Sequence, residues 1–201
     1  MKQKKYSIKD DFSMLALLIM PVGVAVNFVG GQLASLLKLP VYMDTIGTIF
    51  SSMLCGPWVG AVTGCLTNIV IGIADPTGFP FIPVSVVLEF VCGFLSRKKM
   101  FGTWWKSAIS AVLLGLTSTI VSAPIVVLVY GGVTGAGTSL LTATAMAAGA
   151  NIWSAVIGTA GLFTVIDRII ALIISIMVIK VIPARTLVKF GCGSNYIKEN
   201  K

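Results

Sequence analysis

The feature that most constrains this chain is a succession of apolar runs, each suited to a membrane helix. Six runs stand out, over about 13–37, 41–55, 58–74, 81–95, 107–130 and 163–182. A helix needs roughly 20 apolar residues to cross a bilayer, although a bundle tolerates shorter ones. Hydrophobic residues make up 56% of the chain and charged residues only 11%, whereas soluble domains carry about 25% charged residues. The sequence therefore predicts an all-α integral membrane protein, a compact bundle of six transmembrane helices in a single domain over 1–201.

The stretch from Gly131 to Gly161 is harder to assign. GGVTGAG predicts a flexible loop. SLLTATAMAAGANIWSAV, over 139–156, predicts a helix rich in small residues. We expect an extra, partly inserted helical segment before the last span. An extension of the sixth span and a seventh span stay open as alternatives.

Basic residues flank the apolar runs unevenly. With six spans, three basic regions fall on one side of the membrane, and the other side keeps only Lys38 and Arg168. Because cytoplasmic loops carry an excess of lysine and arginine, we expect both termini in the cytoplasm, with tails over 1–12 and 183–201. The expected location is the bacterial plasma membrane, as a multi-pass protein. The three basic regions contain Lys2, Lys4, Lys5 and Lys9; Arg97, Lys98, Lys99 and Lys106; and Lys180, Arg185, Lys189, Lys198 and Lys201.

Several functional classes are not expected. The net charge of +8 does not indicate a nucleic-acid partner, because the charges gather at the ends of apolar runs, where they flank lipid. The four cysteines form no C-x-x-C pair and the chain has no histidine, so we expect no metal, no cofactor and no Ser/His/Asp or Cys/His catalytic set. The sequence holds no G-x-x-x-x-G-K-[ST] phosphate loop either. We therefore expect a protein that is not an enzyme.

Carboxylates concentrate in the outward half of the predicted bundle. Asp44 lies near the outer end of the second run and Asp75 follows the third. Glu89 lies near the middle of the fourth run, and Asp167 with Arg168 lies near the outer start of the last. Ionisable groups at membrane depth are costly, so they usually face a water-filled cavity or each other. The pattern predicts a substrate pocket that opens outward.

Uncharged side chains complete the expected pocket. Aromatic faces stack on flat rings, and Tyr42, Tyr130 and Trp153 provide such faces. Asn68 and Asn151 provide amides in apolar surroundings. The residues that we expect to bind substrate are Tyr42, Asp44, Asn68, Asp75, Glu89, Asn151, Trp153, Asp167 and Arg168.

The acidic candidates also have structural alternatives. Asp44 suits the N-terminus of a helix, where a carboxylate favours the helix dipole. Asp75 begins a turn-like DPTG sequence. Asp167 and Arg168 suit a buried ion pair, and Glu89 suits either pairing with a basic residue or protonation. The sequence does not decide between these roles.

Small residues recur every four positions in the third run. Gly56, Gly60 and Gly64 are followed at the same spacing by Asn68 and Gly72. This spacing puts them on one stripe of a helix, where a neighbouring backbone can come close and an amide can bond across the interface. We favour packing inside the bundle, with a docking face for another membrane subunit as the alternative.

The stretch from Leu39 to Asn68 carries a family resemblance. LPVYMDTIGTI, followed by CGPWVGAVTGCLTN, resembles the substrate-binding membrane subunit, or S component, of energy-coupling factor (ECF) transporters. The resemblance implies that the protein binds a micronutrient from outside and docks on a transmembrane coupling subunit with two ATPases. ATP hydrolysis in these partners then reorients the bundle and releases the substrate inside. The resemblance also implies small residues spaced four apart on the first helix, as a contact with the coupling subunit. Here Met20, a large residue, follows Ala16 at that spacing, so no coupling motif is assigned to the first run.

The expected charges favour a neutral or cationic heterocycle. A strongly anionic substrate would need more cations than Lys38 and Arg168 provide. We therefore expect a nucleoside first and a water-soluble vitamin second. Two other functions stay open: a stand-alone ion-coupled secondary transporter with Glu89 or Asp44 as the coupling carboxylate, and a small membrane enzyme that uses paired acids.

Overall fold

The computed structural model describes residues 8–197, and this part of the chain contains helices and loops but no strand. Within it, five helices are long and apolar enough to cross a membrane. They are α2 (Met14–Leu36), α4 (Pro57–Ala74), α5 (Ile82–Arg97) with the short helix η1 (Pro76–Phe81) before it, α6 (Trp104–Tyr130), and the continuous run of α8 (Ile152–Val156), η2 (Ile157–Gly161) and α9 (Leu162–Val181). The all-helical prediction is therefore confirmed for these residues.

The second predicted span contains a much shorter helix. α3 covers only Ile46–Cys55, because Met43 adopts a positive φ of 52° before it and Gly56, at φ 106°, ends it ahead of Pro57. Ten residues reach about 15 Å, which is half of a hydrocarbon core of about 30 Å. α3 is largely buried among α2, α4, α5 and α9. The number of spans stays a prediction.

The 139–156 segment is divided between two elements. α7 covers Ser139–Ala147, and the chain then turns through Gly149 at φ 94°. The Asn151 side chain accepts a hydrogen bond from the backbone N–H of Trp153 and so starts α8. The second half of the segment thus extends the last long helix, which begins about ten residues earlier than the sequence predicted.

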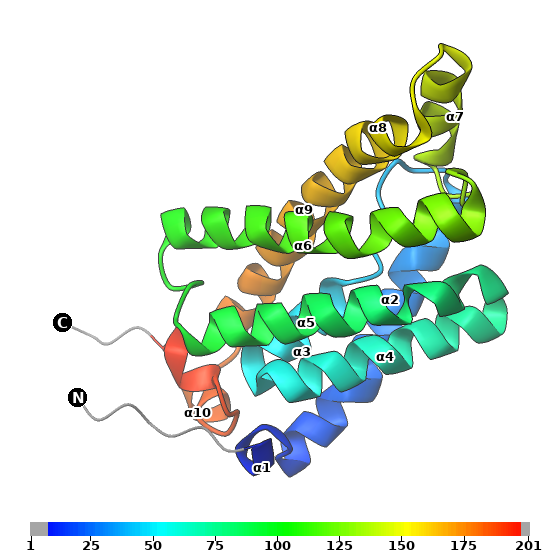
Figure 1. Cartoon of the computed structure of the whole chain (residues 1–201). Helices are drawn as coiled ribbons and strands as arrows, with labels where there is room; N and C mark the ends of the chain where they lie inside the picture. The colour runs from blue at the N-terminus through cyan, green and yellow to red at the C-terminus, as the bar shows by residue number, and fades with distance from the viewer. Residues whose placement is uncertain (1–7, 198–201) are drawn as a thin grey trace.

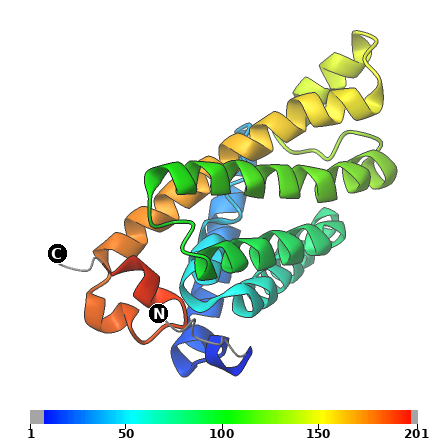
Figure 2. The same ribbon diagram turned by 60° about the vertical axis from the view of Figure 1, so that its left-hand side comes forward.

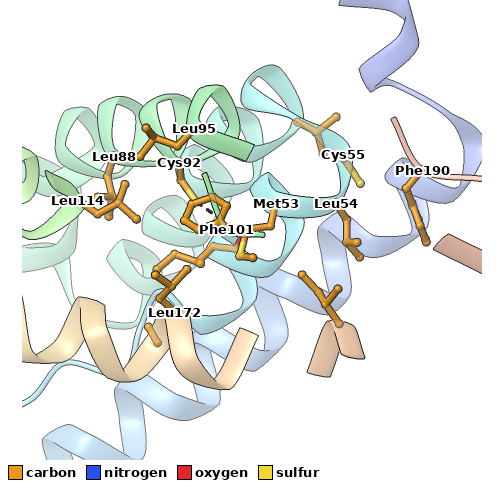
Figure 3. Packing of buried hydrophobic residues seen from close by; sticks show 14 of the residues in the cluster. Met53, Leu54, Cys55, Leu88, Cys92, Leu95, Phe101, Leu114, Leu172 and Phe190 are labelled. Atoms are coloured by element: carbon orange, nitrogen blue, oxygen red, sulfur yellow. Dashed lines mark hydrogen bonds between the residues drawn. The ribbon is translucent and has the colours of Figure 1, made fainter. Parts of the chain in front are cut away.

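Figures 1 and 2 show the long helices packed side by side, with α7 at one end of the bundle and α1 (Ile8–Asp11) and α10 (Ala184–Leu187) at the other. The main apolar cluster lies toward the α1 and α10 end. Figure 3 shows Met53 and Leu54 from α3 packed with Cys92 from α5 and with Phe190. This cluster closes the bundle at that end.

Both predicted tails contain packed structure. Asp11 is buried and pairs with Arg97 at 2.6 Å. Near the other terminus, the backbone N–H of Cys192 donates to the carbonyl of Leu54 at 2.8 Å. The tails predicted over 1–12 and 183–201 therefore join the bundle within the described residues. The basic residues that fall outside the described part are Lys2, Lys4, Lys5, Lys198 and Lys201, and the orientation in the membrane stays a prediction.

The row of small residues on α4 faces neighbouring elements. A Cβ on Gly60 would collide with Ser52 of α3, and one on Gly64 would lie 3.1 Å from the Ser85 carbonyl of α5. A Cβ on Gly72 would lie 2.7 Å from the Phe79 ring. The packing interpretation is confirmed at Gly60, Gly64 and Gly72, because each of them has a close neighbour from the same chain.

Candidate functional site

A cavity of about 580 Å³ opens at the α7 end of the bundle, away from the main apolar cluster. Its walls come from α2, the segment between α2 and α3, α4, η1, α5, α6, the loop before α7, and the α8–α9 run. The charged residues that line it are Lys38, Asp44, Asp75 and Arg168. Its size matches the clefts of about 300–1,000 Å³ that hold small organic molecules.

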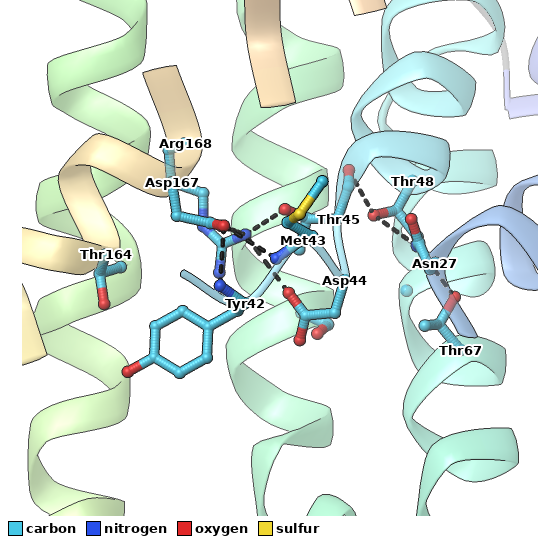
Figure 4. A network of polar contacts seen from close by, with 12 residues as sticks. Asn27, Tyr42, Met43, Asp44, Thr45, Thr48, Thr67, Thr164, Asp167 and Arg168 are labelled. Carbon is cyan, nitrogen blue, oxygen red and sulfur yellow. Dashed lines mark hydrogen bonds and ion pairs between the residues drawn. The ribbon is translucent and has the colours of Figure 1, made fainter. Parts of the chain in front are cut away.

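One wall of the cavity is organised by Asp167 at the start of α9. Its Oδ1 atom accepts hydrogen bonds from the backbone N–H groups of Tyr42 at 2.9 Å and Met43 at 2.8 Å. Figure 4 shows this carboxylate facing the segment that joins α2 to α3. Met43 has a left-handed backbone, which costs energy for a residue other than glycine. The two hydrogen bonds therefore help to hold that conformation.

Arg168 joins the same network from the next position. Its Nη1 atom donates to Asp167 Oδ2 at 3.0 Å and to the hydroxyl of Thr45. Asp44 Oδ1 lies 3.7 Å from the same nitrogen, as an ion pair without a hydrogen bond. α9 and the segment before α3 are thus connected by two carboxylates and one guanidinium (Figure 4).

Tyr42 links this wall to the loop before α7. Its hydroxyl lies 3.0 Å from the hydroxyl of Thr138, and Gly137 packs directly against the Leu39 carbonyl, leaving no space for a Cβ. Burial raises the pKa of Tyr42, so the hydroxyl stays neutral at physiological pH. Burial also raises the pKa of the Asp44 carboxyl, and the positive charge of Arg168 opposes this effect.

Beside this wall, Asn27 anchors the N-terminus of α3. Its Oδ1 accepts from the backbone N–H of Gly47 at 2.6 Å, and its Nδ2 donates to Thr48 at 3.1 Å and Thr67 at 3.3 Å. One amide therefore bridges α2, α3 and α4 (Figure 4). Within the described residues, no group of His, Cys, Asp and Glu gathers that would hold a metal ion.

A comparison with models of protein families identifies the family of this chain. A family model described as "ECF transporter, substrate-specific component" matches residues 15–179. The chain is an ECF transporter S component. Comparisons with curated proteins and with solved structures gave no match. The chain is therefore a membrane transport subunit and not an enzyme, and its family implies an ECF module with a coupling subunit and ATPases.

The S component brings five of the nine candidate residues to the cavity wall. These are Tyr42, Asp44, Asn68, Asp75 and Arg168. Asn68 pairs with the Ser85 hydroxyl of α5. The Asp75 carboxylate accepts from the backbone N–H and the hydroxyl of Thr77, which is the turn role that its sequence suggests. Asp167 lies behind the wall and acts on it through hydrogen bonds.

The other three candidates lie apart from the cavity lining. Glu89 is fully buried, and its Oε2 accepts from the Ser52 hydroxyl at 2.6 Å. Asn151 starts α8, and Trp153 is 42% exposed. The sequence could not separate these residues from the wall, because polarity and aromaticity do not specify which face of a helix a residue occupies.

Several cavity residues of the S component were missed. α6 contributes Ser118, Thr119 and Ser122, and α9 contributes Thr164. Ser118 and Ser122 lie four positions apart and so share one face of a helix, which was an available signal. Phe81 also lines the cavity, and its ring stacks on Tyr130 with centroids 5.6 Å apart and planes 9° apart.

Proposed function

We propose that this S component captures a small organic micronutrient, a nucleoside or a water-soluble vitamin, in the cavity at the α7 end of the bundle. The observation that carries the proposal is the convergence of charged, hydroxyl and aromatic side chains on one space of about 580 Å³. Binding sites of small molecules combine apolar walls with a few polar groups that fix orientation. Asp44, Ser118 and Phe81 exemplify these three kinds of group.

The distribution of charge supports an outward-facing cavity. Lys98, Lys99 and Lys106 lie between α5 and α6 or at the start of α6, at the end opposite the cavity. Because basic residues favour the cytoplasmic side, the cavity would then open to the exterior of a bacterial plasma membrane. The exposed Trp104 and Trp105 beside these lysines suit the interface between lipid and water.

Family membership supports delivery with partners. We propose that a coupling subunit and two ATPases dock on the S component, hydrolyse ATP and reorient the bundle so that the ligand is released inside. Apolar side chains on one face of α2 are exposed in the isolated chain, for example Leu18 at 63% and Val22 at 58%. Such a face suits lipid or a membrane partner.

Calorimetry on the purified S component in lipid nanodiscs tests the binding step. A panel of nucleosides and water-soluble vitamins is titrated at neutral pH. We expect at least one compound to bind, and Ser118→Ala to weaken that binding. Thr117→Ala is the matched control, because Thr117 lies next to Ser118 but bonds to the Leu113 carbonyl of its own helix. Folded protein that binds no compound in the panel would contradict the proposal.

Uptake assays separate this function from a stand-alone ion-coupled carrier. Proteoliposomes are prepared with the S component alone and with a complete ECF module. We expect uptake only with the module and ATP. Uptake by the S component alone that disappears when the ion gradient collapses would favour the carrier. Glu89→Gln would abolish uptake by a carrier that uses this acid, whereas module-driven uptake should persist.

A further inference from the structure

The wall formed by α9 and the segment before α3 has an unequal charge balance. Asp44 and Asp167 contribute two carboxylates, while Arg168 contributes one guanidinium. The side chains of Asp44, Asp167 and Arg168 are 32%, 2% and 7% exposed. With both acids ionised, the cluster is therefore short of one positive charge at a place where water screens charge weakly.

Asp44 is the acid of this cluster that can still accept hydrogen bonds. Both oxygens of Asp167 are already engaged, Oδ1 by two backbone N–H groups and Oδ2 by Arg168. Asp44 Oδ1 is buried and has no hydrogen-bond partner among the described residues. Its distance of 3.7 Å from Arg168 exceeds that of a hydrogen bond. The Asp44 side chain is nevertheless 32% exposed and lines the cavity, so a ligand can reach the other carboxylate oxygen and donate to it.

The other charges of the cavity do not provide compensation. Lys38 and Asp75 line it with opposite signs, and both residues are exposed. Solvent and salt screen such charges strongly. Asp75 also directs its carboxylate to Thr77. The electrostatic preference inside the cavity is therefore set by Asp44, Asp167 and Arg168.

A flat aromatic face lies in the same cavity. The Phe81 ring lines the space and stacks on Tyr130. The hydroxyl of Tyr130 donates to the Thr77 carbonyl at 2.7 Å, which fixes the stack. Aromatic faces attract cations as well as flat rings. The ring therefore favours the same ligand charge as the carboxylate does.

We propose that the ligand carries a positively charged nitrogen group, a protonated amine or a charged nitrogen heterocycle, and that Asp44 is its anchor. This inference rests on the proposed function and specifies the chemical class of its ligand. A charged N–H group would bond to Asp44 through a charge-assisted contact, which is stronger than a neutral one. A strongly anionic ligand would meet the excess of carboxylate.

Ligand pairs of similar shape and different charge test the inference. Pyridoxamine is compared with pyridoxine, and N1-methyladenosine with adenosine, by calorimetry at neutral pH on the full chain in nanodiscs. We expect the charged member of a binding pair to bind about tenfold more tightly, a difference of about 1.4 kcal/mol. Asp44→Asn should remove this preference. Thr117→Ala, on α6 and outside the cavity lining, should retain it.

Two outcomes would overturn the inference while leaving the proposed function intact. In the first, the tightest ligand in the wider nucleoside and vitamin panel is neutral or anionic. In the second, Asp44→Asn weakens the tightest ligand no more than Thr117→Ala does. A complete lack of binding by folded wild-type protein contradicts the proposed function itself. Thermal unfolding of each variant shows whether it is folded.

Discussion

The carboxylate of Asp167 accepts the backbone N–H of Met43 at 2.8 Å and so joins α9 to a segment 124 positions earlier in the chain. The same oxygen accepts the N–H of Tyr42. Met43 keeps a left-handed backbone at this point. Since Tyr42 and Asp44 flank Met43 and both line the cavity, one buried acid determines the position of two wall residues without lining the cavity itself.

Replacing Asp167 by alanine should destabilise the bundle and weaken ligand binding together. The change leaves the Arg168 guanidinium without its hydrogen-bonded carboxylate and two backbone N–H groups without their acceptor. Removing one partner of a buried ion pair costs about 3–5 kcal/mol. Reversible unfolding in mixed detergent micelles measures this loss. Asp167→Asn keeps an acceptor oxygen, so it should recover part of the stability.

Asp75→Ala provides the control for this prediction. Asp75 also accepts a backbone N–H, but it lies in an exposed turn. We expect it to lower the free energy of unfolding by no more than about 1 kcal/mol. Equal losses for Asp167→Ala and Asp75→Ala would show that the buried network adds nothing beyond local turn structure.

Ligand binding should weaken as the pH falls. Burial raises the pKa of the Asp44 carboxyl, so protonation begins at a higher pH than for an ordinary aspartate. The protonated form carries no charge to attract a cation. Calorimetry with N1-methyladenosine, which stays positively charged in acid, should show declining affinity in wild type and a flat profile in Asp44→Asn.

Acidification should weaken ligand binding but should have the opposite effect on the stability of the ligand-free protein, through the same Asp44 carboxyl. A pKa that is higher in the folded than in the unfolded state contributes stability below this pKa, and the contribution is lost as the pH rises through it. Acidification through this range should therefore stabilise wild type relative to Asp44→Asn. A stability difference between the two proteins that does not change with pH would contradict the raised pKa.

The sequence predicted the helical membrane bundle because hydrophobicity is a local property. Runs such as 58–74 and 107–130 agree with α4 and α6 to within three residues. The predicted run over 41–55 agrees less well, because α3 begins only at Ile46. Nothing in the letters VYMDT shows that Met43 takes a left-handed backbone, which is held by hydrogen bonds to a residue over 100 positions away.

The cavity was predicted only in part, for a related reason. Rare charged residues in apolar surroundings, such as Asp44 and Arg168, are conspicuous in any membrane sequence. Ser118 and Thr164 are not, because serine and threonine hydroxyls commonly bond to the carbonyl four residues earlier, as Thr164 does to Ala160. Whether such a residue also faces a cavity depends on how α6 and α9 pack, and this is a tertiary property.

The ion pair between Asp11 and Arg97 should stabilise the end of the bundle opposite the cavity. Arg97 Nη2 lies 2.6 Å from Oδ1 and 2.7 Å from Oδ2 of the fully buried Asp11 carboxylate. The backbone N–H of Trp58, in the first turn of α4, also points to this carboxylate at 3.4 Å. Asp11→Asn should lower the unfolding temperature markedly. Lys106→Ala, at an exposed position of α6, should not.

The location of this ion pair allows a sharper test. Because Asp11 lies far from the lining residues of the cavity, ligand affinity of the folded Asp11→Asn protein should stay within about twofold of wild type. Calorimetry below the unfolding temperature measures this affinity. A large loss of affinity without unfolding would indicate that the two ends of the bundle are coupled.

The contact between Gly23 and Gly47 should tolerate no side chain. A Cβ on Gly47 would collide with the backbone of Gly23, and one on Gly23 would lie 2.9 Å from the Gly47 carbonyl. Both neighbours are backbone atoms of α2 and α3, so neither can rotate away. Gly47→Ala should therefore force the helices apart and cost about 1–3 kcal/mol of unfolding free energy.

Gly158→Ala is the matched control for this last change. Gly158 also lies in a helical run, but a Cβ there would meet no atom within 4 Å. Because alanine restricts the unfolded chain more than glycine does, the variant should be as stable as wild type or more stable by about 0.4–1 kcal/mol. Gly47 also donates its N–H to Asn27, so displacement of α3 should reduce ligand binding in Gly47→Ala alone. Equal behaviour of the two variants would mean that α2 and α3 are not in contact as described.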